Sequence, residues 1–206
     1  MDWRHGGGRP TAAPAPAEAV AKAVEGAAPG VAALLDGVSE DRSHAVLDLG
    51  SAADLTLRVY SRFARWVRFA DLLGESGWAR AGGAAAALAS IPAQPVHPYD
   101  LVFAWDVLDR LFPEDRPGVL ERLAELTGPG ARLHMVVRSD DTLAYPLRFR
   151  LLDVNRIRYE PTVPTPLPRP RLLPAEVARL LAPFRVLHAF TLRNGLREYV
   201  AARPED

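Results

Sequence analysis

Strand-like runs alternate along this chain with segments of helical length, and this alternation is the feature that most constrains the fold. The run HAVLDLG is almost wholly apolar and ends in glycine, which is typical of a parallel strand buried on both faces. Three further strand-like runs follow it: RWVRFADL, YDLVF and ARLHMVV. Because helix-length segments separate these runs, the sequence predicts an α/β fold with a mostly parallel sheet and helices on both faces.

Helical segments connect the strand-like runs, and two of them carry start signals. DLTLRVYSRFA begins at Asp54, which can cap a helix, and DRPGVLERLAEL has Pro117 in its first turn. ESGWARAGGAAAALASI also has helical length, although each glycine of Gly82-Gly83 weakens it by about 1 kcal/mol. We expect a helix in all three segments.

The C-terminal region predicts a helix followed by a hairpin. PAEVARLLAPF has proline at its first position, which suits the start of a helix. Two strand-like runs then flank Asn194-Gly195, and Asn-Gly in this setting is the strongest short-range hairpin signal. The sheet is therefore expected to finish with an antiparallel strand.

The chain divides by composition into regions. Residues 1–15 have no apolar signal core and are expected to form a disordered tail, and residues 16–43 are expected to form N-terminal helices. Residues 44–206 are expected to form the main domain. Within it, residues 138–173 are rich in proline and arginine, which predicts an extended excursion and a candidate substrate lid. Its arginines either recognise an anionic substrate or form a solvated basic face, and we favour the second.

Composition excludes several classes of function. The chain has no cysteine, which excludes disulfides and thiolate metal sites, and no histidine pair has metal-ligand spacing. The formal net charge of zero gives no electrostatic case for nucleic acid or membrane as a partner. No apolar run approaches the roughly 20 residues of a membrane span. We expect a cytoplasmic protein, and the excess of arginine over lysine indicates a bacterial, GC-rich coding bias.

The motifs, taken in order, resemble those of the class I S-adenosylmethionine-dependent methyltransferases. VLDLG is similar to the first motif, the acidic end of VRFAD to the second, and YDLVFAWDVLDRL to the fourth-strand motif. TGPGARLHMVV resembles the turn and fifth strand of the family, and PAEVARLLAPFRV with its hairpin resembles the last helix and reversed final strand. The resemblance covers roughly residues 44–137 and 173–203 and implies a Rossmann-like methyltransferase fold.

This resemblance implies an S-adenosylmethionine site at the carboxyl ends of the first strands. Asp71 would accept the ribose hydroxyls, Asp48 would support the methionine end, and Gly50 would lie close to the cofactor. A polar strand end and a helix cap are the alternative roles for Asp71 and Asp48. The implied cofactor-binding residues are Asp48, Gly50, Ser51, Ala52, Asp54, Asp71 and Trp105.

The glycine loop departs from the family pattern. Gly-x-Gly-x-Gly is replaced by Gly50, Ala52 and Asp54, and a Cβ in such a loop obstructs the approach of a ligand to the backbone. Asp54 either caps the following helix or reaches the positive amino or sulfonium group of the cofactor. Because S-adenosylmethionine has no phosphates, an acid here does not repel it, whereas a nicotinamide dinucleotide requires bare amides and glycines.

The segment between Asp71 and Tyr99 is a second departure, because it is short for a helix and a third strand. The edge strand is therefore expected to be shortened or missing. The adenine contact of the family has no obvious counterpart, and Trp78 and Gln94 are the candidates for it.

Trp105 and Asp106 follow the fourth strand, at the edge where open α/β sheets bind ligands. As weak catalytic candidates, Trp105 would wall a methyl-transfer pocket and Asp106 would orient a nucleophile. We favour the alternative that Trp105 packs beneath the next helix and Asp106 caps it.

The leading hypothesis is an enzyme that positions a small-molecule acceptor for methyl transfer from S-adenosylmethionine. A catalytically inactive methyltransferase-fold protein with a binding or regulatory role is the alternative, and another nucleotide-binding α/β protein is a third. The sequence does not identify the acceptor or the oligomeric state.

Overall fold

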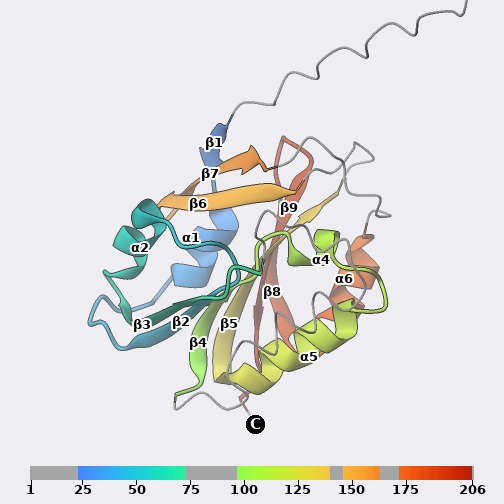
Figure 1. The fold of residues 1–206 in the computed structure, drawn as a ribbon. Helices are drawn as coiled ribbons and strands as arrows, with labels where there is room; N and C mark the ends of the chain where they lie inside the picture. The colour runs from blue at the N-terminus through green and yellow to red at the C-terminus, as the bar shows by residue number, and fades with distance from the viewer. Residues whose placement is uncertain (1–22, 73–96, 140–145, 163–171, 206) are drawn as a thin grey trace, which may run out of the picture.

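The computed structural model describes residues 23–72, 97–139, 146–162 and 172–205. Six strands of this part form the central sheet, in the order β3-β2-β4-β5-β9-β8 (Figure 1). The strands are β2 (His44–Asp48), β3 (Ala64–Phe69), β4 (Tyr99–Phe103), β5 (Thr127–Arg138), β8 (Arg185–Thr191) and β9 (Leu196–Ala202). Strands β3, β2, β4 and β5 pair in parallel, and β9 is antiparallel to both of its neighbours. The predicted α/β fold with a reversed final strand is therefore confirmed.

The central strands are apolar because both of their faces are covered. Val46 and Leu47, neighbours in β2, are both fully buried, although their side chains point to opposite faces of the sheet. The connection between β8 and β9 contains Gly195 with a φ of +77°, a conformation that glycine adopts without steric cost. The Asn-Gly signal thus marks a real hairpin.

Five helices of the described residues connect these strands. They are α1 (Pro29–Leu35), α2 (Asp54–Tyr60), α4 (Val107–Arg110), α5 (Arg116–Leu126) and α6 (Pro174–Leu180). The side chain of Glu198 in β9 lies against α1, whereas that of its neighbour Tyr199 lies beside the first residue of α6. Successive strand residues point to opposite faces, so α1 covers one face of the sheet and α6 the other. Figure 1 shows α5 beside α6, and these two helices are in contact.

The N-terminal region corrects one prediction. Val24–Ala27 forms strand β1, whereas the sequence predicted a helix there. Strand β1 pairs antiparallel with β7 (Arg156–Pro161), and Glu25 forms ion pairs with Arg156 and Arg158. The alanine-rich segment favours a helix locally, but pairing with a distant strand overrides that preference. A helix does follow, and it begins at Pro29, where a missing N–H costs nothing.

The described middle of the Pro/Arg-rich region, residues 147–161, forms a hairpin where an extended excursion was predicted. Strands β6 (Leu147–Asp153) and β7 pair antiparallel, and together with β1 they form a second sheet in the order β1-β7-β6. Figure 1 shows β6 crossing the upper end of the central sheet. It is held there by two backbone N–H groups: Leu147 donates to Asp106 and Leu151 donates to Thr56 of α2.

Other predictions fall outside the described residues. The helix expected in ESGWARAGGAAAALASI, the shortened edge strand and the tail at residues 1–15 all lie there. The division into a tail, N-terminal helices and a main domain therefore stays a prediction.

A glycine exchange tests the packing of α1 on the sheet. A Cβ added to Gly30 would lie 2.7 Å from the Cβ of Glu198, whereas one added to Gly118 in α5 would have no neighbour within 4 Å. We expect Gly30→Ala to lower the free energy of unfolding by about 1–3 kcal/mol. Gly118→Ala is the matched control and should raise it by about 0.5–1 kcal/mol. Urea unfolding followed by circular dichroism measures both, and a stabilising Gly30→Ala would contradict this packing.

Candidate functional site: the carboxyl edge of the central sheet

The loops that follow β2, β3 and β4 meet at one edge of the central sheet. The backbone N–H of Leu49 donates to Phe103 at 3.0 Å, and that of Asp71 donates to Gly50 at 3.1 Å. Parallel pairing places the carboxyl ends of these strands together, which is where the sequence predicted a ligand crevice. The loops carrying all the predicted site residues are thus brought to one place.

Asp48 is the polar centre of this edge. Its side chain is buried, and its carboxylate accepts hydrogen bonds from the Gly50 N–H at 2.7 Å, the Tyr60 hydroxyl at 2.7 Å and the Trp105 indole Nε1–H at 2.6 Å. Burial raises the pKa of Asp48 to about 6, and the hydrogen bonds from Tyr60 and Trp105 limit the rise. The carboxylate is therefore satisfied by the protein's own donors.

Trp105 occupies the space in front of Asp48. Only 1% of the residue is exposed, and its ring stacks on Phe149 of β6 with a centroid distance of 5.1 Å and an interplanar angle of 6°. The ring of His134 lies edge-to-face with the same indole, and the two ring centroids are 5.5 Å apart. The backbone φ of Trp105 is +49°, a left-handed conformation that is a genuine outlier for a bulky residue. The tertiary contacts hold this strained backbone in place.

Gly50 is required at this edge, for a reason that the sequence did not reveal. A Cβ on Gly50 would lie 3.0 Å from Asp48 Oδ1 and 3.2 Å from Trp105 Nε1. The predicted reason for this glycine was close approach by a cofactor. In the structure, the group that approaches it closely is the indole of Trp105.

Asp106 is buried and bound on both of its oxygens. Oδ1 accepts from Nε of Arg110 at 2.9 Å, and Oδ2 accepts from the backbone N–H of Leu147 at 3.1 Å. The residue stands at the N-cap position of α4, but among the described residues its carboxylate makes no capping hydrogen bond to that helix. Trp105 is thus packed in the interior as expected, but beneath β6 rather than beneath the next helix. Asp106 stands at the N-cap position as expected, but its carboxylate joins α4 to β6.

The remaining predicted cofactor residues lie at the surface. Ala52, Asp54 and Asp71 are exposed, and Ser51 is half-buried. Asp54 is the first residue of α2 rather than its N-cap, and within the described structure α2 has no side-chain cap. The structure thus buries Asp48 and Trp105, leaves Gly50 and Ser51 half-buried beside them, and exposes Ala52, Asp54 and Asp71. Trp78 and Gln94 lie outside the described residues.

Glu198 is a further buried acid, and the sequence did not predict it as a site residue. His134 is fully buried, as predicted for a core residue, and its Nε2 lies 3.3 Å from Oε1 of Glu198, which is also fully buried. Oε2 of Glu198 accepts from the N–H of Gly30 at 2.6 Å and so fixes the start of α1. The signal for it was the single acid of the LREYVAA strand, next to Arg197 and followed by a mostly apolar run.

The described residues also bear on metal binding and on membrane crossing. No group of three or more histidine, aspartate or glutamate side chains in this part could hold a metal ion. No helix of the same part is long and apolar enough to cross a membrane.

Comparison with known proteins gives matches among solved structures. No protein-family model and no curated protein matches the chain. The 1,6-didemethyltoxoflavin-N1-methyltransferase of Burkholderia thailandensis, solved with its substrate and S-adenosylhomocysteine, is 17% identical with a TM-score of 0.45, covering 85% of this chain and 77% of that one. The N-methyltransferase NodS of Bradyrhizobium japonicum WM9 is 14% identical with a TM-score of 0.44, covering 86% and 94%.

A protein of Sulfolobus solfataricus assigned to the type 11 methyltransferases is 12% identical with a TM-score of 0.48, covering 84% of this chain and 90% of that one. The resemblance to class I S-adenosylmethionine-dependent methyltransferases is confirmed in the sense that structural matches to them extend across most of the chain. At this low identity the likeness concerns the fold alone.

The pH dependence of stability tests the environment of Asp48. A carboxyl group with a raised pKa binds its proton more tightly in the folded state than in the unfolded chain, so stability falls as the pH rises through that range. Asp48, with its pKa raised to about 6, should cost the fold up to about 3 kcal/mol between about pH 4 and about pH 7. In Asp48→Asn this loss should be smaller, because the amide carries no charge at any of these pH values; its oxygen can still accept from Gly50 and Trp105, and its NH2 group donates to the Tyr60 hydroxyl instead of accepting from it. Urea unfolding at a series of pH values measures the difference.

Asp109 supplies the comparison for that experiment. Burial raises its pKa to about 7, and its carboxylate accepts from the backbone N–H of Arg138 at 2.8 Å. Asp109→Asn should therefore remove a separate part of the pH dependence, at slightly higher pH. Identical pH profiles for the wild type and Asp48→Asn would show that Asp48 is not held as described.

Proposed function

We propose that this chain is a methyltransferase-fold protein that does not catalyse methyl transfer through the usual crevice and acts instead as a binding or regulatory protein. The observation that carries this proposal is the position of Trp105. Its indole lies between Asp48 and Phe149, with its N–H bound to Asp48 at 2.6 Å. The methionine end of a cofactor would need the same carboxylate and the same space.

The energetics of opening the crevice support this proposal. A tryptophan side chain buries 150–250 Å², roughly, and stacking on another ring adds about 0.5–1.5 kcal/mol. Removing the indole would also leave the buried Asp48 without one of its donors, at a cost of about 1–3 kcal/mol. A ligand must offset these costs before it gains any affinity, which weakens its apparent binding.

A second candidate is the methyl transfer that the sequence motifs predict, from S-adenosylmethionine to a small-molecule acceptor. One observation favours it: Asp71 is exposed, and its N–H binds Gly50 at the same edge of the sheet. A carboxylate for the ribose hydroxyls is therefore at hand if Trp105 leaves the crevice. The two candidates differ in whether the wild-type chain binds the cofactor.

Calorimetric titration with S-adenosylmethionine and S-adenosylhomocysteine separates the two candidates. We expect no saturable heat with either ligand up to about 1 mM, because Trp105 keeps its place. Proton NMR provides a positive reading of the same state. The indole N–H of Trp105 should exchange slowly with solvent, and its signal should not shift when S-adenosylhomocysteine is added.

Two variants complete this experiment. Trp105→Phe assigns the protected indole signal by removing it, and Trp66→Phe is the control, since Trp66 is 56% exposed and its signal should be unprotected. Micromolar cofactor binding that Asp71→Ala abolishes would reject the proposal and restore the enzyme hypothesis.

A further inference from the structure

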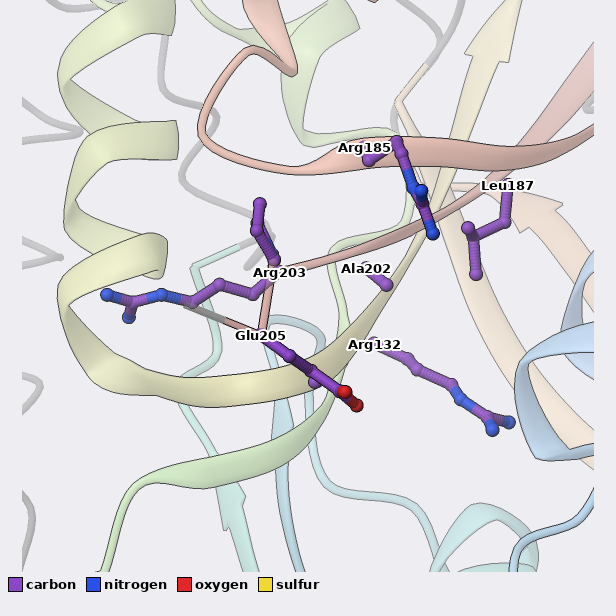
Figure 2. A pocket seen from close by; sticks show the side chains of 8 residues that line it. Arg132, Arg185, Leu187, Ala202, Arg203 and Glu205 are labelled. Carbon is purple, nitrogen blue, oxygen red and sulfur yellow. The ribbon is translucent and has the colours of Figure 1, made fainter.

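A depression lies at the opposite edge of the central sheet, where the parallel strands begin. It has a volume of about 550 Å³ and is lined by residues at the starts of β5 and β8 and the end of β9. Figure 2 shows these side chains around the depression. It is separate from the crevice at Asp48, which is formed by the carboxyl ends of β2 and β4.

Three residues form a row across the floor of the depression. Arg132 of β5 stands opposite Ala202 of β9, and Ala202 stands opposite Arg185 of β8. Directly opposed residues of antiparallel strands project from the same face, with Cβ atoms about 4.5–5.5 Å apart. The two arginines therefore flank a small side chain, and the methyl group of Ala202 leaves the space between them open.

Arg132 is fixed in its position by the end of α1. Its Nη1 donates to the carbonyls of Leu34 at 2.8 Å and Asp36 at 2.6 Å. These carbonyls lie at the negative end of the helix and orient the guanidinium, which keeps its other N–H groups. The guanidinium of Arg132 is thus a hydrogen-bond donor held in a fixed position on one side of the depression.

Arg185 supplies the opposite side. It is exposed, and within the described residues its side chain has neither a hydrogen bond nor an ion pair. Figure 2 shows its side chain extending over the depression, whereas Arg203 points away toward α5, where it binds Ala124 and Thr127. The acid of the rim is Glu205, which is exposed and lies beyond ion-pair distance of these arginines in the described structure. A free guanidinium and a fixed one that line the same depression are suited to binding an anion.

We propose that this depression binds a phosphoryl group carried by a small organic molecule. Two guanidinium groups on opposite sides of a small floor suit a dianion with several acceptor oxygens better than a single carboxylate. Leu187 and Pro204 line the same depression and provide apolar surface for the organic part. The volume is in the range of small-molecule sites.

Calorimetric titration of the whole chain with phenyl phosphate tests this site. We expect saturable binding at millimolar concentration or tighter, and weaker binding of inorganic phosphate, which lacks the apolar part. Arg185→Gln should weaken phenyl phosphate binding roughly tenfold or more, because it removes a charged donor. Ala202→Leu should weaken it similarly, since the larger side chain fills the floor without changing any charge.

Arg179→Gln is the matched control, because Arg179 is an exposed arginine of α6 outside the depression. It should leave phenyl phosphate binding unchanged. Arg185→Gln alters an exposed side chain, so it remains informative if Ala202→Leu fails to fold. No saturable binding of phenyl phosphate up to about 10 mM, or equal affinity in the wild type and Arg185→Gln, would overturn the proposal. Cofactor titrations do not bear on it, since the two sites lie at opposite edges of the sheet.

Discussion

The hydrogen bond from the Trp105 indole to Asp48 determines what the carboxyl edge of this sheet can do. A buried carboxylate needs donors, and a crevice that supplies none leaves it dependent on water or a ligand. Here the indole N–H, the Tyr60 hydroxyl and the Gly50 N–H occupy both oxygens. Asp48, which the sequence predicted to support a cofactor, therefore has its hydrogen-bonding capacity used within the protein core.

The second sheet belongs to this closed arrangement. Phe149 of β6 covers the indole, and the backbone of Leu147 binds Asp106, the residue that follows Trp105. Strand β1 then extends the same sheet from the N-terminal side, with Glu25 clamped by two arginines of β7. The hairpin is thus tied to both the core and the chain's N-terminal region, and its position brings Phe149 onto the indole of Trp105.

Local signals predicted the inner strands β2 and β4 well, because burial on both faces makes such strands apolar whatever their partners are. Three other signals likewise depend only on the backbone of the residues that carry them. Pro117 and Pro174 lie at the starts of helices in the structure, and Asn194-Gly195 lies in the hairpin between β8 and β9. Strand β1 could not be predicted in this way, since its partner lies far along the chain and the local composition favours a helix. The role of Trp105 depends on Phe149 in the same way: neither residue alone indicates that their rings stack.

The altered glycine loop follows from the same constraint. Glycines are needed in such a loop where a ligand approaches the backbone, and Trp105 replaces that ligand at only one position. Gly50 remains because a Cβ there would meet the indole and the Asp48 carboxylate. Ala52 and Asp54 are exposed, so no packed neighbour forbids their side chains. The loop therefore has glycine where side chains of the protein lie close to the backbone, and has other residues where their side chains are exposed.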